Sequence, residues 1–559
     1  MKKQFKSYTI LLALISLLMA CTDQRKTEEQ SGERSTDQTE TPKPVQQQFA
    51  YAPEQASQHI RQWLDSSGLA IDLPKIEEGA VAQDLHIFYS ERNFQPAWTP
   101  ERADELVTRI ENIQQEGLNP NSYPLDSLRL LVRQASDQEN PKTGAQLDIL
   151  LSATYLKLAD VIATGKVKPG DFFNSWHIKP LEPDTLYTHL QDAVAGHVDA
   201  SLDYFRPQFD QYEKLQHYLN RYTRLVNEGG WPRIDEGNAL APGDSSQRLV
   251  AIRQRLHLTG DLETAPAQGK SSTYYDAALE NAVNRYQARN GLPVQPEITS
   301  QMIAAMNVPA EERLQQLMLN LDRIRWFASG EMDKTYVLVN IPEYRLRVYE
   351  GGREIKKMKV VVGKQMNATP IFSDQIDHVV FSPYWNVPTS IATEEIIPKA
   401  RNNPSYLERN KYELLNAGGK PVVPSRQALE NFDEYRIRQK PGPWNALGSV
   451  KFMFPNDFAI YLHDTPQEHL FERSERAFSH GCIRIEEPDW MADWLLPQLN
   501  RQQVRSKLEG GRREVVQLKN KVPVYIFYLT AFEDTEGRLN FREDLYQLDE
   551  RLKEQFNIL

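Results

Sequence analysis

The chain has 559 residues, of which 40% are hydrophobic and 25% are charged, and it contains 34 prolines. This composition is typical of a folded protein with several domains of about 150 residues each, and it excludes a wholly disordered chain. The formal net charge of -11 argues against the basic surface that nucleic-acid binding requires, so no nucleic-acid partner is expected.

Residues 1–20 have the pattern of a signal peptide, with lysines at positions 2, 3 and 6 and then an apolar run from Ile10 to Ala20. The run is too short to span a bilayer, and no later segment has the roughly 18 uninterrupted apolar residues that a spanning helix needs. The sequence Leu18-Met19-Ala20-Cys21 resembles a bacterial lipobox, in which the cysteine is lipidated. The resemblance implies lipid attachment at Cys21; the alternative is an ordinary cleavage site near this cysteine.

Residues 21–48 are almost free of apolar side chains, so we expect a disordered, lipid-anchored tether. From residue 49 to 240, apolar residues recur at helical spacing, for example from Leu147 to Ile162, which predicts a helical scaffold domain without a catalytic constellation. Aromatic residues in this region are expected mainly in the core, with a glycan groove as the alternative role. They are Phe94, Trp98, Phe172, Phe173 and Trp176.

Residues 246–309 predict a compact unit of three helices, at about Gln247 to Leu256, Tyr275 to Arg289 and from Thr299 onward. Gly291 can supply a left-handed cap after the second helix. The segment from Val283 to Leu292, VNRYQARNGL, resembles a small helical peptidoglycan-binding module. The alternative is a generic helical linker domain.

A helix at about Glu311 to Trp326 precedes a mainly β domain over residues 334–530. Segments 336–340, 345–349 and 359–362 predict strands, and Glu350-Gly351-Gly352 predicts a hairpin turn. Residues 394–435 are polar and irregular, which predicts a helical capping insertion, and residues 531–559 predict a helical tail. The predicted fold class is thus multi-domain α+β: a helical N-terminal scaffold, a small helical domain, and a mainly β domain with an insertion.

The residues expected to take part in catalysis lie near the end of the β domain. Two expected strands, 450–454 and 458–463, lead to a loop that ends in Ser479-His480-Gly481-Cys482. A thiol is a good nucleophile only as thiolate, so a cysteine needs a neighbouring imidazole, and His463 is the expected base. Gly481 allows a tight turn that aims backbone N–H groups at a developing oxyanion.

This pattern predicts a cysteine acyl-transfer site. The alternative is a metal site built from His463, His469, His480 and Cys482, but the spacing matches no structural zinc site, so no metal or other cofactor is expected. With Cys21 acylated, Cys482 has no cysteine left with which to form an internal disulfide. A buried, inert cysteine is the remaining alternative.

A histidine followed at a distance by Ser-His-Gly-Cys resembles the signature of the YkuD-type L,D-transpeptidases, and the long N-terminal region and the insertion resemble the large YcbB-like branch of that family. Three further segments match: Tyr384 to Pro388, Gly442 to Gly448, and Tyr461 to Thr465. The resemblance covers most of the chain from about Phe49, and its specific motifs lie in the last two hundred residues.

The resemblance implies a role for each matching residue. Cys482 would be the nucleophile and His463 the proton acceptor and donor, with Ser479, His480 and the amides of Gly481 and Cys482 in support. Arg484 stands where shorter members have Asn, and would either bind a substrate carboxylate or form a structural ion pair. The residues implied to line the substrate groove are Tyr384, Trp385 and Asn386.

The implied reaction cross-links peptidoglycan stem peptides between their third residues, with release of the terminal D-Ala. The insertion would cover the donor peptide and restrict water. The alternatives are a hydrolase that uses the same two residues and a non-catalytic wall-binding lipoprotein. The implied partners are stem peptides, glycan and, through the lipid, a membrane; the implied location is the periplasm, on the outer membrane.

Overall fold

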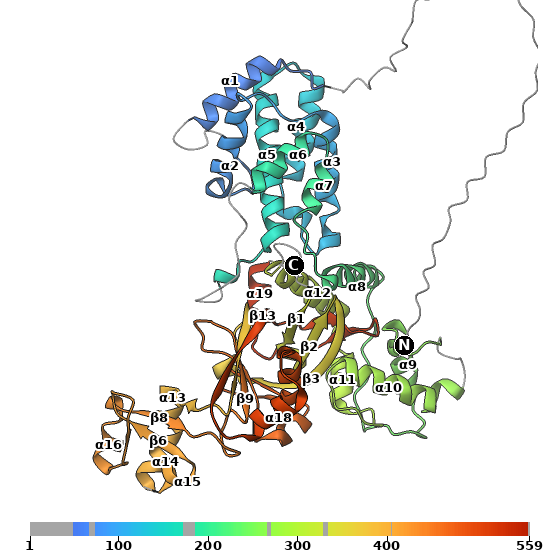
Figure 1. The fold of residues 1–559 in the computed structure, drawn as a ribbon. Coiled ribbons are helices and arrows are strands. Elements are labelled where there is room, and N and C mark those ends of the chain that lie inside the picture. Colours follow the sequence, from blue (N-terminus) through green and yellow to red (C-terminus); the bar gives the residue numbers. More distant parts are fainter. Residues whose placement is uncertain are drawn as a thin grey trace, which may run out of the picture. The chain divides into compact units, whose positions relative to one another are not determined.

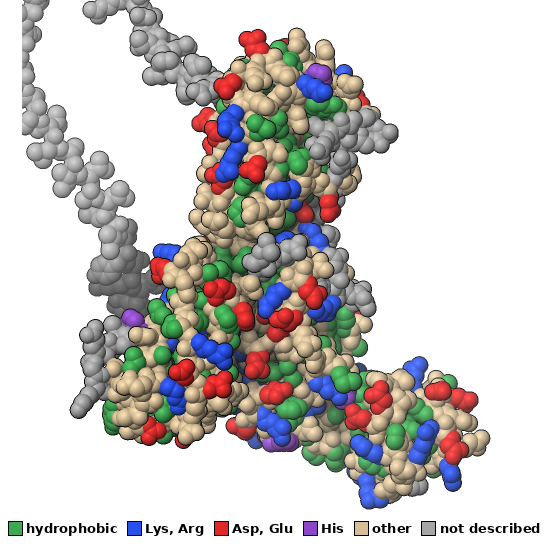
Figure 2. Space-filling model, turned by 180° about the vertical axis from the view of Figure 1, so that it is seen from behind, with side chains coloured by type: hydrophobic (Ala, Val, Ile, Leu, Met, Phe, Trp, Pro, Cys, Tyr) green, Lys and Arg blue, Asp and Glu red, His purple; other side chains and the backbone are tan. Residues whose placement is uncertain are grey.

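The computed structural model describes residues 48–65, 73–171, 185–264, 270–327, 334–403 and 405–556. The predicted signal peptide, Cys21 and nearly all of the predicted tether lie outside the described residues, as do Phe172, Phe173 and Trp176. None of the helices in the described ranges is long and apolar enough to cross a membrane. On the face shown in Figure 2, acidic and basic side chains are interspersed.

The N-terminal region is helical, as predicted. Its central helix, α5 (Pro141–Thr164), is buried around most of its circumference and contacts all six surrounding helices, most extensively α1, α2, α4 and α6 (Figure 1). Asp148 on α5 is fully buried but accepts hydrogen bonds from Tyr89 Oη and from the backbone N–H groups of Ala97 and Trp98, which satisfies its charge. The surrounding helices are α1 (Pro53–Leu64), α2 (Glu78–Glu91), α3 (Pro100–Glu111), α4 (Leu125–Asp137), α6 (Thr185–Val194) and α7 (Val198–Asp203).

The three predicted helices of the small unit are present as α9 (Arg248–Leu258), α10 (Ala277–Arg289) and α11 (Ser300–Met306). Gly291 has φ of +71° after α10, and the Leu292 N–H donates to the Gln287 carbonyl. This is the left-handed C-cap expected from the sequence. The helices share one apolar core.

The β domain is built on a nine-stranded sheet in the order β11-β3-β12-β10-β9-β4-β13-β1-β2, and β2 also pairs with β3, so the strands close on themselves. The predicted strands and the hairpin turn at Glu350 to Gly352 are confirmed. The strands are β1 (Tyr336–Asn340), β2 (Arg345–Glu350), β3 (Arg353–Gly363), β4 (Phe372–Phe381), β9 (Val450–Met453), β10 (Leu462–His463), β11 (Ala477–Ser479), β12 (Ile483–Ile485) and β13 (Glu514–Phe527).

Strand β1 shows why the sequence of this domain is so apolar. Val337 and Val339 face the core of the closed sheet, whereas Tyr336 and Leu338 face a second core formed with α8 (Asp210–Asn227) and α12 (Ala310–Arg325). Burial on both faces requires a continuous apolar run rather than alternation. Helices α17 (Pro488–Leu495) and α18 (Arg501–Glu509) add to the core of the closed sheet.

The insertion is not purely helical, and its elements run from Trp385 to Gln439 rather than over 394–435, so the prediction is corrected in both respects. Its short helices are accompanied by a four-stranded sheet in the order β5-β8-β6-β7, with an apolar core of its own. The short polar strands carry too little periodicity to be recognised. The elements are β5 (Trp385–Asn386), α13 (Thr389–Ile391), a π-helical turn (Ala392–Ile396), α14 (Ile397–Asn402), α15 (Tyr406–Arg409), β6 (Tyr412–Leu415), β7 (Pro421–Val422), α16 (Arg426–Glu430) and β8 (Arg436–Gln439).

Two other predictions need correction. The expected strand over 458–463 is ordered as a strand only at β10, because Asn456 and Ala459, which has φ of +54°, turn the chain before it. The C-terminal tail is not helical throughout: the hairpin of β14 (Ala531–Glu533) and β15 (Leu539–Phe541) precedes α19 (Leu548–Phe556). Helix α19 packs on α12, where Asp549 forms a buried ion pair with Arg323.

Candidate active site

Strand pairing brings the candidate base next to the candidate nucleophile. β10 and β12 run parallel, with Leu462 opposite Ile483 and His463 opposite Arg484. Leu462 and Ile483 point into the core, so His463 and Arg484 share the other face, because side chains alternate along a strand. Cys482 directly precedes β12 and is hydrogen-bonded to Tyr461, the residue before β10. Residues 463 and 482 are therefore close in space.

The thiol of Cys482 is held in its protonated form. The side chain is half-buried, and its Sγ–H donates to the backbone carbonyl of Ala459 over 3.7 Å. Burial raises the pKa of Cys482, while hydrogen bonds from Tyr461 and the charges of Lys451 and Arg484 act in the opposite direction without cancelling the rise. The thiol therefore needs a base before it can attack.

His463 has the properties of that base. Its side chain is buried, with 4% of the residue exposed, and Nδ1 lies 2.5 Å from the backbone carbonyl of Asp464. A carbonyl only accepts, so Nδ1 carries the proton and Nε2 is left as the acceptor. Burial and then the charge of Arg484 lower the pKa of His463 to about 3; the hydrogen bond to the Asp464 carbonyl acts in the opposite direction, and the charge of Lys451 adds a smaller lowering effect. The imidazole is neutral at physiological pH.

The end of β10 is fixed by a turn that contains Gly448. Asp464 Oδ2 accepts hydrogen bonds from the N–H and the hydroxyl of Ser449, at 2.7 and 2.8 Å. Gly448 has φ of +62°, and a Cβ atom there would lie 2.2 Å from Asp464 Oδ2. Only glycine fits this position. The segment Gly442 to Gly448, which resembles the family but had no role assigned from the sequence, thus helps to place the carbonyl that orients His463.

The Ser479 to Cys482 loop is braced by its own hydrogen bonds. Ser479 Oγ donates to the Cys482 carbonyl at 2.6 Å and accepts from the Gly481 N–H at 3.1 Å. Gly481 has φ of +112°, and its carbonyl accepts from Thr369 Oγ1. The Gly481 N–H is thus already paired, whereas no acceptor for the Cys482 N–H is found in the described ranges. Of the two amides expected at the oxyanion, that of Cys482 is the one available.

His480 turns toward the insertion. Its Nε2 lies 3.0 Å from Oε1 of Glu395, which belongs to the π-helical turn, and both side chains are partly exposed. This contact joins the loop that carries Cys482 to the insertion. π-helical turns are often found at functional sites.

The predicted groove residues are divided between two environments. Trp385 and Asn386 form β5 and pair with β8, so they belong to the sheet of the insertion, where Trp385 packs against its core. Tyr384 lies under the guanidinium of Arg438, 4.4 Å from the ring centroid. Asn386 is exposed. No contact of these three residues with Cys482 or His463 is recorded in the described part of the chain.

Lys451 was not singled out from the sequence. It lies on β9 directly opposite His463, and its charge acts on both His463 and Cys482. Strand pairing between β9 and β10 makes it part of the site, and its place within the predicted strand 450–454, three residues before the strand end, was the only sequence signal. Arg484 lies on the other side of His463.

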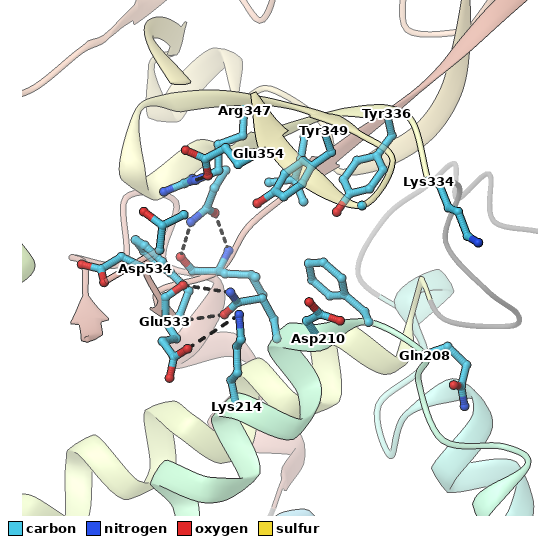
Figure 3. Close-up of a pocket in the computed structure, with 18 residues that line it drawn as sticks. Gln208, Asp210, Lys214, Lys334, Tyr336, Arg347, Tyr349, Glu354, Glu533 and Asp534 are labelled. Carbon is cyan, nitrogen blue, oxygen red and sulfur yellow. Dashed lines mark hydrogen bonds and ion pairs between the residues drawn. The ribbon is translucent and has the colours of Figure 1, made fainter. Parts of the chain in front are cut away.

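Among the residues that the structure describes, no group of three or more His, Cys, Asp and Glu side chains could hold a metal ion. Two cavities of about 360 and 370 Å³ lie away from Cys482 and His463. The first is lined by side chains of α8, β1, β2 and the β14–β15 hairpin, where Tyr336 and Tyr349 stack and Lys214 pairs with Glu533 (Figure 3). In its wall Arg347 pairs with Glu354, and Asp534 pairs with Arg538 outside the lining.

Comparison with known families agrees with this architecture. Residues 334–526 match the family described as the L,D-transpeptidase catalytic domain, YkuD, and residues 83–219 match a family described as a scaffold domain. The chain therefore contains a region similar to the L,D-transpeptidase catalytic domain.

Among individual proteins, a putative L,D-transpeptidase of Haemophilus influenzae is 33% identical over 246 residues, which cover 43% of this chain and 49% of the relative. The chain thus spans about half the length of this curated relative. Solved structures that match include an L,D-transpeptidase of Xylanimonas cellulosilytica (11% identity, 52% of this chain and 99% of that chain, TM-score 0.15) and L,D-transpeptidase 1 of Mycobacterium tuberculosis (13% identity, 36% and 64%, TM-score 0.14).

Proposed function

We propose that the protein is a peptidoglycan L,D-transpeptidase that works by cysteine acyl transfer, with Cys482 as nucleophile and His463 as general base. The observation that carries the proposal is the arrangement of this pair. Cys482 directly precedes β12, next to the end of β10, where a buried imidazole has its Nδ1 hydrogen-bonded to a backbone carbonyl, so Nε2 is left to accept the thiol proton.

In the first half-reaction, His463 Nε2 accepts the Cys482 proton while Sγ attacks the carbonyl carbon of the third residue of a donor stem peptide. The oxyanion receives a hydrogen bond from the Cys482 N–H. The C–N bond to the terminal D-Ala breaks, and the D-Ala amine takes the proton from His463. A thioester and free D-Ala result.

In the second half-reaction, the side-chain amine of the third residue of another stem attacks the thioester. His463 accepts a proton from this amine and returns it to the leaving Cys482 sulfur. The product is an amide between two third residues. Water in place of the amine would give a tripeptide, and a hydrolase is therefore the second candidate function.

The other parts of the chain fit this assignment. We propose that the insertion covers the donor and limits water, since Glu395 ties it to the loop of the nucleophile. Residues 246–309 are proposed to hold glycan strands, and Cys21 to carry a lipid on the outer membrane, with the enzyme in the periplasm. Stem peptides, glycan and membrane are the proposed partners, and no cofactor takes part in the steps above.

The proposal is tested by incubating the purified full chain with disaccharide-tetrapeptide and analysing the products. We expect cross-linked dimer and one D-Ala released per cross-link, with loss of both in Cys482→Ala and in His463→Gln. The matched control is His469→Gln, an exposed histidine six residues later, which should retain activity. Tripeptide without dimer would identify a hydrolase, and neither product would refute the enzymatic assignment.

A further inference from the structure

Two cations flank His463 on the sheet. Lys451 on β9 lies directly opposite His463 in antiparallel pairing, and Arg484 on β12 lies opposite it in parallel pairing. Residues that pair directly across strands place their side chains on the same face. Lys451, His463 and Arg484 therefore form one row, and Cys482 lies beside it.

Neither cation has a carboxylate partner in the described ranges. The Lys451 Nζ lies over the ring of Tyr461, 4.6 Å from its centroid, and is half-buried. Arg484 donates to the neutral side chain of Gln467 at 2.6 Å, while its Nε is buried without a partner. The ion pair that the sequence left open for Arg484 is thus not found there.

Many other cations in the described ranges have carboxylate partners, whereas the buried Arg255 and Arg476 donate to backbone carbonyls instead. The lysines on β3 next to β12 pair with glutamates, Lys356 with Glu487 and Lys359 with Glu486. Four buried arginines likewise have carboxylate partners; they are Arg289, Arg323, Arg325 and Arg347. Burying an uncompensated charge costs free energy, so two unpaired cations on either side of the same imidazole indicate a site for an anion that comes from outside the chain.

The thiol of Cys482 is not that anion in the resting protein, because it is protonated. A carboxylate suits the site: a guanidinium can bind it through two N–H groups, and a lysine adds a second charge. In a peptide whose last residue is the leaving group, only the nitrogen and the Cα atom separate the scissile carbonyl from the terminal carboxylate. Such a carboxylate therefore lies within about 4 Å of the bond that breaks.

We propose that Lys451 and Arg484 bind the terminal carboxylate of the donor peptide and so restrict Cys482 to the last peptide bond. The inference rests on the proposed function. One further residue on the donor would move the carboxylate about 3.5 Å along the chain, out of register with the two cations. The bound carboxylate would also offset the charges that act on His463, which raises the pKa of its imidazole and makes it a stronger base.

The site can be tested without any turnover. Iodoacetate and iodoacetamide alkylate the same thiol, but only iodoacetate carries a carboxylate. Rates at Cys482 in the full-length protein are followed by peptide mass spectrometry, and the iodoacetate-to-iodoacetamide ratio is normalised to that of glutathione. We expect a ratio at least tenfold above glutathione for the wild type, a loss of about tenfold in Lys451→Met, and retention in Lys451→Arg. The matched control is Lys142→Met, an exposed lysine of α5, which should keep the wild-type ratio.

A wild-type ratio equal to that of glutathione would overturn the inference, even if D-Ala were released from peptidoglycan. An equal slowing of both reagents in Lys451→Met would also overturn it, because Lys451 would then act only on the thiol pKa. A raised ratio that falls in Lys451→Met supports the carboxylate site even if the proposed function fails. If the protein is active, KM for a tetrapeptide donor with an amidated C-terminus should be higher than KM for the free acid in the wild type. In Lys451→Met the two KM values should differ little.

Discussion

At the scale of single residues, Gly448 should not tolerate a side chain, because an added Cβ atom would collide with the Asp464 carboxylate that holds the end of β10. We predict that Gly448→Ala lowers the free energy of unfolding by more than about 2 kcal/mol, from left-handed strain and steric overlap together. Displacement of Asp464 should also reduce D-Ala release at least tenfold, as measured in a coupled assay.

Gly352→Ala is the matched control for this change. Gly352 also has positive φ, +78°, but no atom lies within 4 Å of the position that a Cβ would take there. The Gly352→Ala variant should lose only about 1–2 kcal/mol of the free energy of unfolding, which is the cost of the left-handed backbone conformation, and should keep full activity. Equal losses of activity in both variants would contradict the role given to the turn at Gly448.

His463 makes stability depend on pH. Its folded pKa of about 3 lies below the ordinary value of 6.5, so between these pH values the unfolded chain binds a proton that the folded chain does not. The free energy of unfolding should therefore fall as pH falls from 6.5, by up to about 1.4 kcal/mol per pH unit from this residue. Urea unfolding of wild type and His463→Gln between pH 7 and pH 5 measures the difference, and parallel curves would contradict a buried neutral imidazole.

The proposed nucleophile Cys482 and the proposed base His463 could be singled out from sequence because both lie in short, contiguous motifs. Lys451 could not, since its role arises from the register of β9 against β10, which no local pattern specifies. The same holds for Asp464, whose backbone and side chain both act at the site.

At the scale of elements, the contact between His480 and Glu395 links the nucleophile loop to the insertion. We predict that Glu395→Ala loosens the insertion, with amide hydrogen exchange over 389–403 faster by up to about fivefold, the equivalent of about 1 kcal/mol for a partly exposed pair. The ratio of tripeptide to cross-linked dimer should rise as water gains access.

Glu394→Ala is the control for this change, since Glu394 is the exposed neighbour for which no ion pair is recorded among the described residues. It should leave exchange and product ratio unchanged. If Glu395→Ala and Glu394→Ala give the same exchange rates and product ratios, the contact between His480 and Glu395 does not hold the insertion in place.

Elements with strong local periodicity were predicted well. The helices α5, α10 and α12 and the strands β1 to β3 follow from apolar spacing and turn residues, and the cap at Gly291 was placed correctly. The sheet of the insertion was missed because β5 and β7 have two residues each, and β6 and β8 become strands only by pairing with each other.

At the scale of the whole molecule, a buried charge network joins the helical region to the helices behind the sheet. Glu116 is 3% exposed; it accepts hydrogen bonds from Arg109 at 2.8 Å and from Tyr212 Oη of α8 at 2.7 Å. Arg325 of α12 donates to Tyr212 Oη and to the Glu116 carbonyl. The network ties α8 and α12 to the turn after α3.

We predict that Glu116→Gln lowers the free energy of unfolding by about 2–3 kcal/mol, because it removes the buried carboxylate that Arg109 and Arg206 contact, while Arg325 keeps Asp322 as its partner. Glu111→Gln is the control: its pair with Arg129 is largely exposed and should contribute less than about 1 kcal/mol. Guanidinium chloride unfolding followed by tryptophan fluorescence measures both, and equal effects would mean that the network adds nothing beyond a surface ion pair.

The central claim is that Cys482 carries a peptide acyl group during the reaction. Intact mass spectrometry of the full chain, quenched with acid shortly after mixing with disaccharide-tetrapeptide, tests it most directly. The account predicts a mass increase equal to the donor minus D-Ala, located on the peptide that contains Cys482 and absent from Cys482→Ala and His463→Gln. Folded protein that gains no mass, or a mass gain on another residue, would contradict it.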